Sequence, residues 1–139
     1  MAHHRSSAQP LAWLYVGLIA YASLYPFSGW RLPGPQALDF LFDRQHFWTS
    51  FDLVANLLGY LPFGALAFGA GVRSGRRAWV AVAMATALGA GLSLSMELLQ
   101  NFLPRRVPSN IDLALNTLGT IFGALLGLLV HRCGLVTRW

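Results

Sequence analysis

The chain has 139 residues, of which 55% are hydrophobic and only 11% are charged. About a quarter of the residues in a soluble domain are usually charged, so the composition excludes disorder and argues against an ordinary soluble protein. The formal net charge is +5, and all ten basic residues are arginine. Because these arginines stand in short gaps between long apolar runs, the charge does not indicate a nucleic-acid partner.

Four long apolar runs without Arg or Lys divide the chain. They cover residues 11–27, 53–72, 78–99 and 111–130. A membrane-spanning helix needs about 20 apolar residues, and backbone groups in lipid must be hydrogen-bonded within their own segment. We therefore expect an all-α integral membrane bundle of four transmembrane helices that forms one domain over residues 1–139.

The first run has some features of a cleavable signal peptide. Arg5 precedes it, and Ala-Tyr-Ala at residues 20–22 is similar to a cleavage site. Because three more apolar runs follow, we expect the segment to be retained as a helix.

The arginines also predict the orientation of the helices. The amino-terminal segment, the 73–77 connection and the carboxy-terminal tail hold six arginines and no acid. The other two connections and the adjoining helix ends hold four arginines and all five acids. Arginines in short loops favour the cytoplasmic side. This places both termini and the 73–77 connection in the cytoplasm, and the acids near the outer face.

The connection between the first two runs is long and rich in aromatic residues. One interpretation is that residues 37–48 form an amphipathic helix at the membrane interface, over the pocket at the outer face of the bundle. The more common explanation for Phe47 and Trp48 is anchoring of aromatic side chains at the membrane surface.

The second and fourth runs begin with a similar sequence. Asp52-Leu-Val-Ala-Asn56-Leu-Leu-Gly59 recurs as Asp112-Leu-Ala-Leu-Asn116-Thr-Leu-Gly119, and Phe-Gly-Ala-Leu follows each copy. This internal repeat predicts two helical hairpins related by an axis along the membrane normal. Two unrelated helices with similar interfacial starts are the alternative.

Each copy of the repeat places an aspartate and an asparagine four residues apart, on one helix face. Asp52 and Asp112 suit either helix caps or ligands, and both interpretations stay open. Asn56 and Asn116 lie one turn deeper, where an amide that faces lipid is costly. We expect these two amides to point into the bundle.

The third run ends in a polar stripe, with Ser93, Glu97 and Gln100 on one face. The Glu97 carboxylate needs a partner or a wet cavity at that depth. One interpretation is a Glu97–arginine pair, with Arg105 or Arg106, that holds the next loop. The other is an outward-facing ligand-binding pocket, formed by Asp52, Asn56, Glu97, Gln100, Arg106, Ser109, Asp112 and Asn116.

Glycine and proline predict how the helices pack. Gly119, Gly123 and Gly127 form two successive G-x-x-x-G steps, which allow close approach of another helix, either within the chain or in a helix–helix oligomer. Pro62 predicts a kink in the second helix that frees a carbonyl inside the bundle.

The order of these motifs resembles the VanZ-like family of small bacterial membrane proteins. The resemblance rests on Ser-Leu-Tyr-Pro-Phe at 23–27, Asp52-x-x-x-Asn56, Pro62-x-Gly64, Glu97-x-x-Gln100-x-Phe102, and Arg106-x-x-Ser109-x-x-Asp112-x-x-x-Asn116-Thr-x-Gly119-x-x-x-Gly123. Tyr60 stands where family members tend to have Phe, and residues 28–51 carry no family motif. The resemblance implies a multi-pass protein of the bacterial inner membrane, in the cell envelope, linked to low-level resistance to teicoplanin-type antibiotics.

Three functions fit these residues. In the first, the pocket binds the head group of an amphiphile, either a lipid-linked cell-wall precursor, another membrane lipid or a lipoglycopeptide. Arg106 would hold a phosphate or carboxylate, and the amides of Asn56, Gln100 and Asn116 would bind hydroxyls or amides.

The second is a metal-assisted enzyme acting on lipid-linked diphosphates, with Asp52, Glu97 and Asp112 around a divalent cation. The third is a small scaffold subunit of a membrane complex. The sequence has no Ser–His or Cys–His arrangement, no Gly-rich phosphate loop and no His pair at metal-binding spacing. We therefore favour binding over catalysis and expect no cofactor.

Overall fold

The computed structural model describes residues 7–42 and 49–135. This part of the chain is all-α, and it contains four α-helices and one short 3-10 helix, η1, in the first connection. In chain order they are α1 (Ala8–Leu24), η1 (Asp39–Leu41), α2 (Ser50–Arg73), α3 (Ala78–Gln100) and α4 (Asn110–Arg132).

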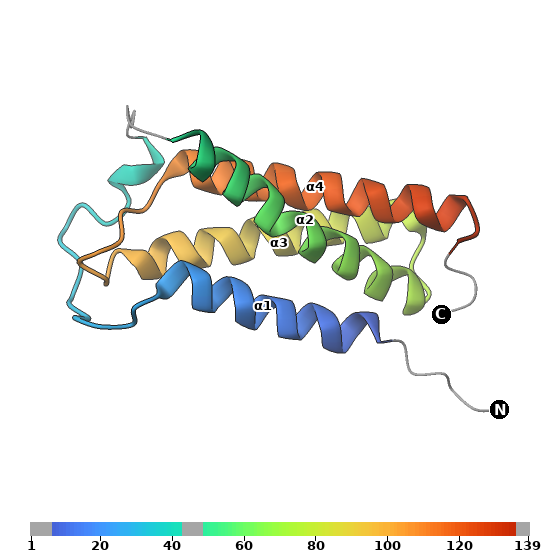
Figure 1. Cartoon of the computed structure of the whole chain (residues 1–139), viewed down its shortest axis with the longest axis horizontal. Coiled ribbons are helices and arrows are strands. Elements are labelled where there is room, and N and C mark those ends of the chain that lie inside the picture. The colour runs from blue at the N-terminus through green and yellow to red at the C-terminus, as the bar shows by residue number, and fades with distance from the viewer. Residues whose placement is uncertain (1–6, 43–48, 136–139) are drawn as a thin grey trace.

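The α-helices form an up-and-down bundle (Figure 1). The start of α1, the α2–α3 turn and the end of α4 lie at one end, which we call the short-turn end. The described part of the first connection (residues 25–42 and 49) and the connection at residues 101–109 lie at the other, the long-loop end. A hydrogen bond of 2.9 Å from the Arg31 N–H to the Phe102 carbonyl joins the two connections. The helices thus alternate in direction along the chain, as in an up-down-up-down bundle.

Three helices are long and apolar enough to cross a membrane, namely α2, α3 and α4. Helix α1 is also apolar but has only 17 residues. Large apolar side chains on α1, including Trp13, Leu14 and Leu18, are exposed on the surface of the bundle. The predicted all-α fold is confirmed and three membrane spans are supported, while a fourth span through α1 stays a prediction.

Helix α1 ends earlier than its apolar run. The sequence predicts residues 11–27, whereas the helix covers Ala8–Leu24. Pro26 explains the early end, because a residue that precedes proline is disfavoured in the α conformation, and Tyr25 is extended with ψ 136°. Pro10 lies in the first turn, where its missing N–H costs nothing. The other three helices begin and end within three residues of their predicted limits.

The predicted interfacial helix at residues 37–48 is only partly described. Within residues 37–42, the helical structure is limited to the 3-10 turn Asp39–Leu41, with Phe40 buried at its centre. Residues 43–48, which include Phe47 and Trp48, lie outside the described part of the chain. In the described half, a single 3-10 turn therefore replaces the first half of the predicted helix.

Helices α2 and α4 run in the same direction and pack backbone against backbone (Figure 1). A Cβ on Gly64 would overlap the backbone of Thr120, and one on Gly119 or Gly123 would overlap the carbonyl of Leu57 or Leu61. The glycines of α4 therefore allow α2 to pack closely against α4 within one chain. A helix–helix oligomer through the same glycines stays a prediction, and so does the relation of the two helical hairpins by an internal repeat.

The core divides along the bundle into two clusters. Near the long-loop end, Ile19 and Leu24 of α1 pack with Phe63 of α2 and Met96 of α3. Toward the short-turn end, small side chains of α3 and α4 pack around the buried ring of Phe68. Helix α1 contacts α2 and α3 but lies on the opposite side of the bundle from α4 (Figure 1).

Pro62 lies within α2, and the helix continues through it. Proline has no N–H, so it cannot donate to the carbonyl one turn earlier, that of Leu58. The next carbonyl, Gly59, accepts a hydrogen bond of 2.9 Å from the Tyr15 hydroxyl of α1. The proline turn of α2 is therefore also where α1 is attached to α2.

Candidate functional site

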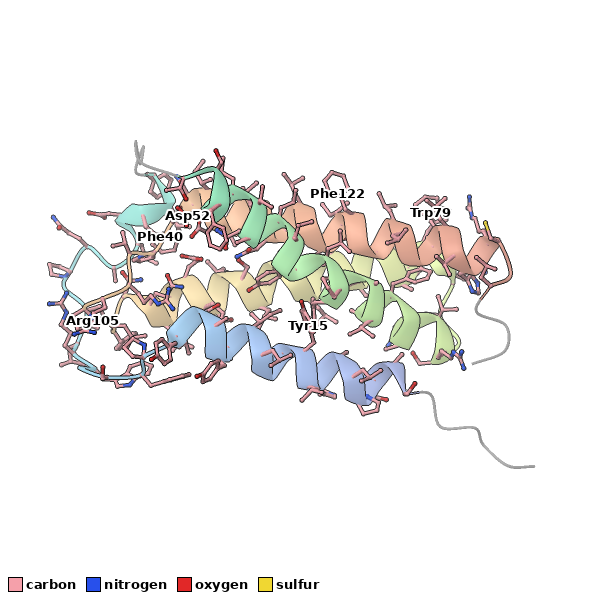
Figure 2. All side chains as sticks on the ribbon, viewed as in Figure 1. Tyr15, Phe40, Asp52, Trp79, Arg105 and Phe122 are labelled. Carbon is pink, nitrogen blue, oxygen red and sulfur yellow. The ribbon has the colours of Figure 1, made fainter. Side chains whose placement is uncertain are left out.

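Three helices carry polar stripes that meet toward the long-loop end. Each stripe has one residue per turn on a face that would otherwise be apolar. The members are Asp52, Asn56 and Tyr60 on α2, Ser93, Glu97 and Gln100 on α3, and Asp112, Asn116 and Thr120 on α4. Figure 2 shows Asp52 beside Phe40 at this end of the bundle, with Arg105 farther out on the connection.

The deepest part of the site joins α4 to α3 and α2. The Asn116 amide is 5% exposed, and its Nδ2 donates a hydrogen bond of 2.9 Å to Oγ of the fully buried Ser93. Tyr60 is 4% exposed, and its hydroxyl lies next to Ser93. Within the described residues, Asn116 Oδ1 has no hydrogen-bond partner. The inner end of the stripes therefore presents an acceptor that the protein itself leaves unpaired.

Glu97 connects α3 to the start of α4. Its side chain is only 2% exposed, and Oε2 accepts a hydrogen bond of 2.8 Å from the Ser109 backbone N–H. Ser109 is the N-cap of α4, and its hydroxyl accepts from the Asp112 N–H at 3.3 Å. The carboxylate of Glu97 thus lies at the positive end of the α4 dipole. Across the described residues no arginine pairs with Glu97, so Ser109 has the role that we considered for an arginine.

Arg106 and Gln100 contact α1. Arg106 donates from Nε to the Tyr25 carbonyl at 2.9 Å and from Nη2 to the Ala22 carbonyl at 2.7 Å. Gln100 Nε2 donates to the Ser23 carbonyl at 3.2 Å. The last carbonyls of a helix lack partners within it, so these two side chains complete the carboxyl end of α1. Of the eight predicted site residues, these two are turned toward α1.

Asp52 forms a capping box with Thr49. Its Oδ2 accepts from the Thr49 N–H at 3.0 Å and from the Thr49 hydroxyl at 2.7 Å, and its own N–H donates to Thr49 Oγ1 at 3.1 Å. The pair is exposed and begins α2. Thr49 was missing from the sequence-based site, although the Thr-x-x-Asp spacing is the signature of a capping box. Asp52 therefore acts as a cap.

Asn56 and Asp112, from the two copies of the repeat, are close to each other. The side chain of Asn56 lies beside the Asp112 carboxylate, which connects the first copy of the repeat to the second. Asp112 also lies within electrostatic range of Asp52 and of Glu97. The three acids thus form one acidic cluster, graded from the exposed Asp52 through the half-buried Asp112 to the buried Glu97.

Residues 7–42 and 49–135 contain no group of three or more His, Cys, Asp and Glu side chains that could hold a metal ion.

Comparison with known proteins places the chain in a family. No curated protein and no solved structure matches it. The model of the VanZ/LLP1 family matches residues 6–131, which includes α1, α2, α3 and nearly all of α4. This match agrees with the resemblance seen in the order of the motifs, from the Ser-Leu-Tyr-Pro-Phe segment to the glycines of α4. The chain therefore belongs to the VanZ/LLP1 family.

Proposed function

We propose that this protein binds the polar head group of an amphiphile at the long-loop end of the bundle, while the apolar part of the ligand lies along the helices. The observation that carries the proposal is the unpaired Asn116 Oδ1, in a site whose other groups are capped or bonded. Ionisable and amide side chains inside membrane helices are costly and are usually functional. Capping accounts for Asp52, and Ser109 accounts for one oxygen of Glu97, but neither accounts for Asn116.

The gradient along the stripes supports an amphiphilic ligand. Polar groups run from the exposed Asp52, through the half-buried Asn56 and Asp112, to the buried Asn116. Apolar side chains on the same two helices, including Phe51, Leu58 and Leu118, are exposed. So is Phe122, which Figure 2 shows on the outside of α4. A molecule with a polar head and an apolar tail suits a polar site bordered by surfaces of this kind.

The proposal includes a place in the cell. We propose a multi-pass protein of the bacterial inner membrane, with α1 as the fourth span, both termini in the cytoplasm and the long-loop end outward. Four described arginines support this orientation, because Arg73, Arg76, Arg77 and Arg132 all lie at the short-turn end. Arg132 stacks over the Trp79 ring there, 5.4 Å from its centroid, which is a typical pairing at a membrane interface.

Membership in the VanZ/LLP1 family suggests which amphiphiles to examine. We propose a lipid-linked cell-wall precursor or a lipoglycopeptide as the ligand, with reduced susceptibility to teicoplanin-type antibiotics as the cellular effect. In this form of the proposal, Arg106 supports the site through its hydrogen bonds to the end of α1.

A photo-crosslinking experiment tests the binding proposal. The protein, in nanodiscs, is incubated with photoreactive amphiphiles that differ in head group, and labelling is competed with the unlabelled compound. We expect saturable labelling at the long-loop ends of α2 and α4. The Asn116→Leu variant should bind about tenfold more weakly, as expected when one buried hydrogen bond to a ligand is lost.

Thr117→Val is the matched control on the same helix. The Thr117 hydroxyl is half-buried and donates within α4 to the Leu113 carbonyl at 2.7 Å, so its loss leaves the polar stripe intact. This variant should bind like the unsubstituted protein. Labelling that is non-saturable, or equal in both variants, would show that the polar stripe does not bind the amphiphile.

A further inference from the structure

We propose that the head group bound at this site carries a primary ammonium. The inference rests on the proposed function, because it names the chemistry of the head group that the same site accepts. It depends on two independent observations, the charge of the groups that meet at the site and the acceptor atom that the protein leaves unpaired.

The site is rich in carboxyl groups. The groups that act electrostatically on one another are the carboxylates of Asp52, Asp112 and Glu97. Arg106, the cation that the sequence predicted for the site, uses two donor nitrogens on the Tyr25 and Ala22 carbonyls. Charges interact strongly in a low-dielectric setting, so an anionic head group beside Glu97 and Asp112 would be repelled and a cation attracted. This reverses the charge that the sequence led us to expect for the ligand.

The hydrogen-bonding groups specify the kind of cation. Asn116 Oδ1 is an acceptor without a partner in the described residues, on a side chain that is 5% exposed. The carboxyl groups of Glu97 and Asp112 act electrostatically on each other, and each lies one helical turn from the Ser93–Asn116 pair along α3 or α4. A primary ammonium has three N–H donors and no acceptor, which matches three acceptor groups. A trimethylammonium group has no N–H and would leave Asn116 unpaired.

Helix capping does not account for the same observations. The capping box explains the exposed Asp52, and the Ser109 N–H explains one oxygen of Glu97. Neither interaction uses the free amide oxygen of Asn116. The Asn116 amide is already anchored by its Nδ2 on Ser93, which holds Oδ1 in place to accept from a ligand.

A series of compounds tests the inference on the unsubstituted protein. Binding to protein in phosphatidylcholine–phosphatidylglycerol nanodiscs is measured by calorimetry for decylamine, decyltrimethylammonium and decyl phosphate, with empty nanodiscs as the blank. We expect decylamine to bind at least about tenfold more tightly than either of the others, the effect of losing one charged hydrogen bond or more. Equal binding of decyltrimethylammonium, or tighter binding of decyl phosphate, would overturn the ammonium and leave the binding function standing. If none of the three binds, both proposals fail.

Two variants locate the effect. Glu97→Gln and Asn116→Leu should each reduce the preference for decylamine over decyltrimethylammonium, whereas Thr117→Val should keep it. An unchanged preference in both site variants would overturn the assignment, and the compound series on the unsubstituted protein decides the question even if a variant fails to fold.

The same assay distinguishes a membrane lipid from a soluble amine as the source of the ammonium. A membrane source predicts that phosphatidylethanolamine in the nanodisc competes with decylamine, while soluble ethanolamine does not. A soluble amine predicts the reverse. Competition by either supports the primary ammonium, and competition by neither overturns it.

Discussion

The two copies of the Asp-x-x-x-Asn repeat have nearly the same sequence but different surroundings. In the first copy, Asp52 is exposed and caps α2 with Thr49, and Asn56 is half-buried. In the second, Asp112 is half-buried and Asn116 is almost completely buried against Ser93. The same motif thus caps a helix in its first copy and is packed into the interior of the bundle in its second.

The neighbours of each copy explain the difference. Helix α4 starts directly after the 101–109 connection. Glu97 of α3 accepts a hydrogen bond from Ser109 at the end of this connection, which holds the start of α4 against α3. The second copy is therefore half-buried already at Asp112, in the first turn of α4. Helix α2 starts after the much longer 25–49 connection, and residues 50–52 in its first turn are exposed. The same four-residue spacing therefore leads to different depths, because the preceding connections differ in length and attachment.

The largest expected loss of stability comes from forcing apart α2 and α4, the two helices that carry the Asp-x-x-x-Asn repeat. Gly123→Ala places a Cβ against the Leu61 carbonyl of α2, so the backbones must move apart. We expect a loss of about 3 kcal/mol or more in the free energy of unfolding, measured in detergent by denaturant titration. Gly91→Ala, where no atom lies within 4 Å of the added Cβ, is the control and should be neutral or slightly stabilising. Equal stability of the two variants would contradict the close contact.

A direct comparison of the two asparagines should give the next largest difference. Asn116→Ala removes the donor to the buried Ser93 and should cost about 2 kcal/mol, whereas Asn56→Ala, at a half-buried position, should cost less than about 1 kcal/mol. Unfolding by the same titration measures both. If Asn56→Ala were the more destabilising, the first copy would be the buried one and the comparison would be reversed.

Arg106→Ala tests the attachment of the 101–109 connection to α1. Two hydrogen bonds from a charged donor are lost, and we expect a cost of about 1.5 kcal/mol. Hydrogen exchange should become faster at the carboxyl end of α1 and stay unchanged at the start of α2. Arg106→Lys should recover only part of the protection, because an ammonium cannot reproduce the planar guanidinium geometry. Full protection in the alanine variant would exclude this role.

The smallest effect is expected for the exposed cap. Asp52→Ala and Thr49→Ala each break the capping box of α2, and both should reduce stability less than Asn116→Ala does. The double variant should lose no more than the larger single effect, because both changes remove the same interaction. A double-mutant cycle measures this coupling, and strictly additive losses would show that the two residues act separately.

Most of the helical fold can be predicted from the sequence. Uninterrupted apolar runs gave the limits of α2, α3 and α4 closely, since lipid and core both favour such runs in helices. The predicted end of α1 was wrong because the apolar run continues past Pro26. Hydrophobicity alone does not show that proline restricts the conformation of the residue before it. The predicted interfacial helix was also wrong over residues 37–42, where the only helical structure is the short 3-10 helix η1. The aromatic content of this segment had suggested a longer helix.

The sequence predicts which residues of the candidate site face inward from the helices, but not which groups they bond to. Regular spacing placed Glu97 and Asn116 on inward faces, and both are buried. The partners of Gln100 and Arg106 were not predictable, because the carbonyls that they bind belong to the end of α1, about 80 residues earlier in the chain. The roles of Tyr60 and Ser93 beside Asn116 likewise depend on how α2 and α3 are turned about their axes.

The attachment of α1 has a mechanical consequence. This helix is held at one point by Tyr15 on the Gly59 carbonyl and at another by Arg106 on the Ala22 carbonyl, about 10 Å farther along its axis. Two hydrogen bonds at separate heights oppose both sliding of α1 along its axis and rotation about that axis. The position of α1 along the bundle is thereby set by α2 and by the 101–109 connection.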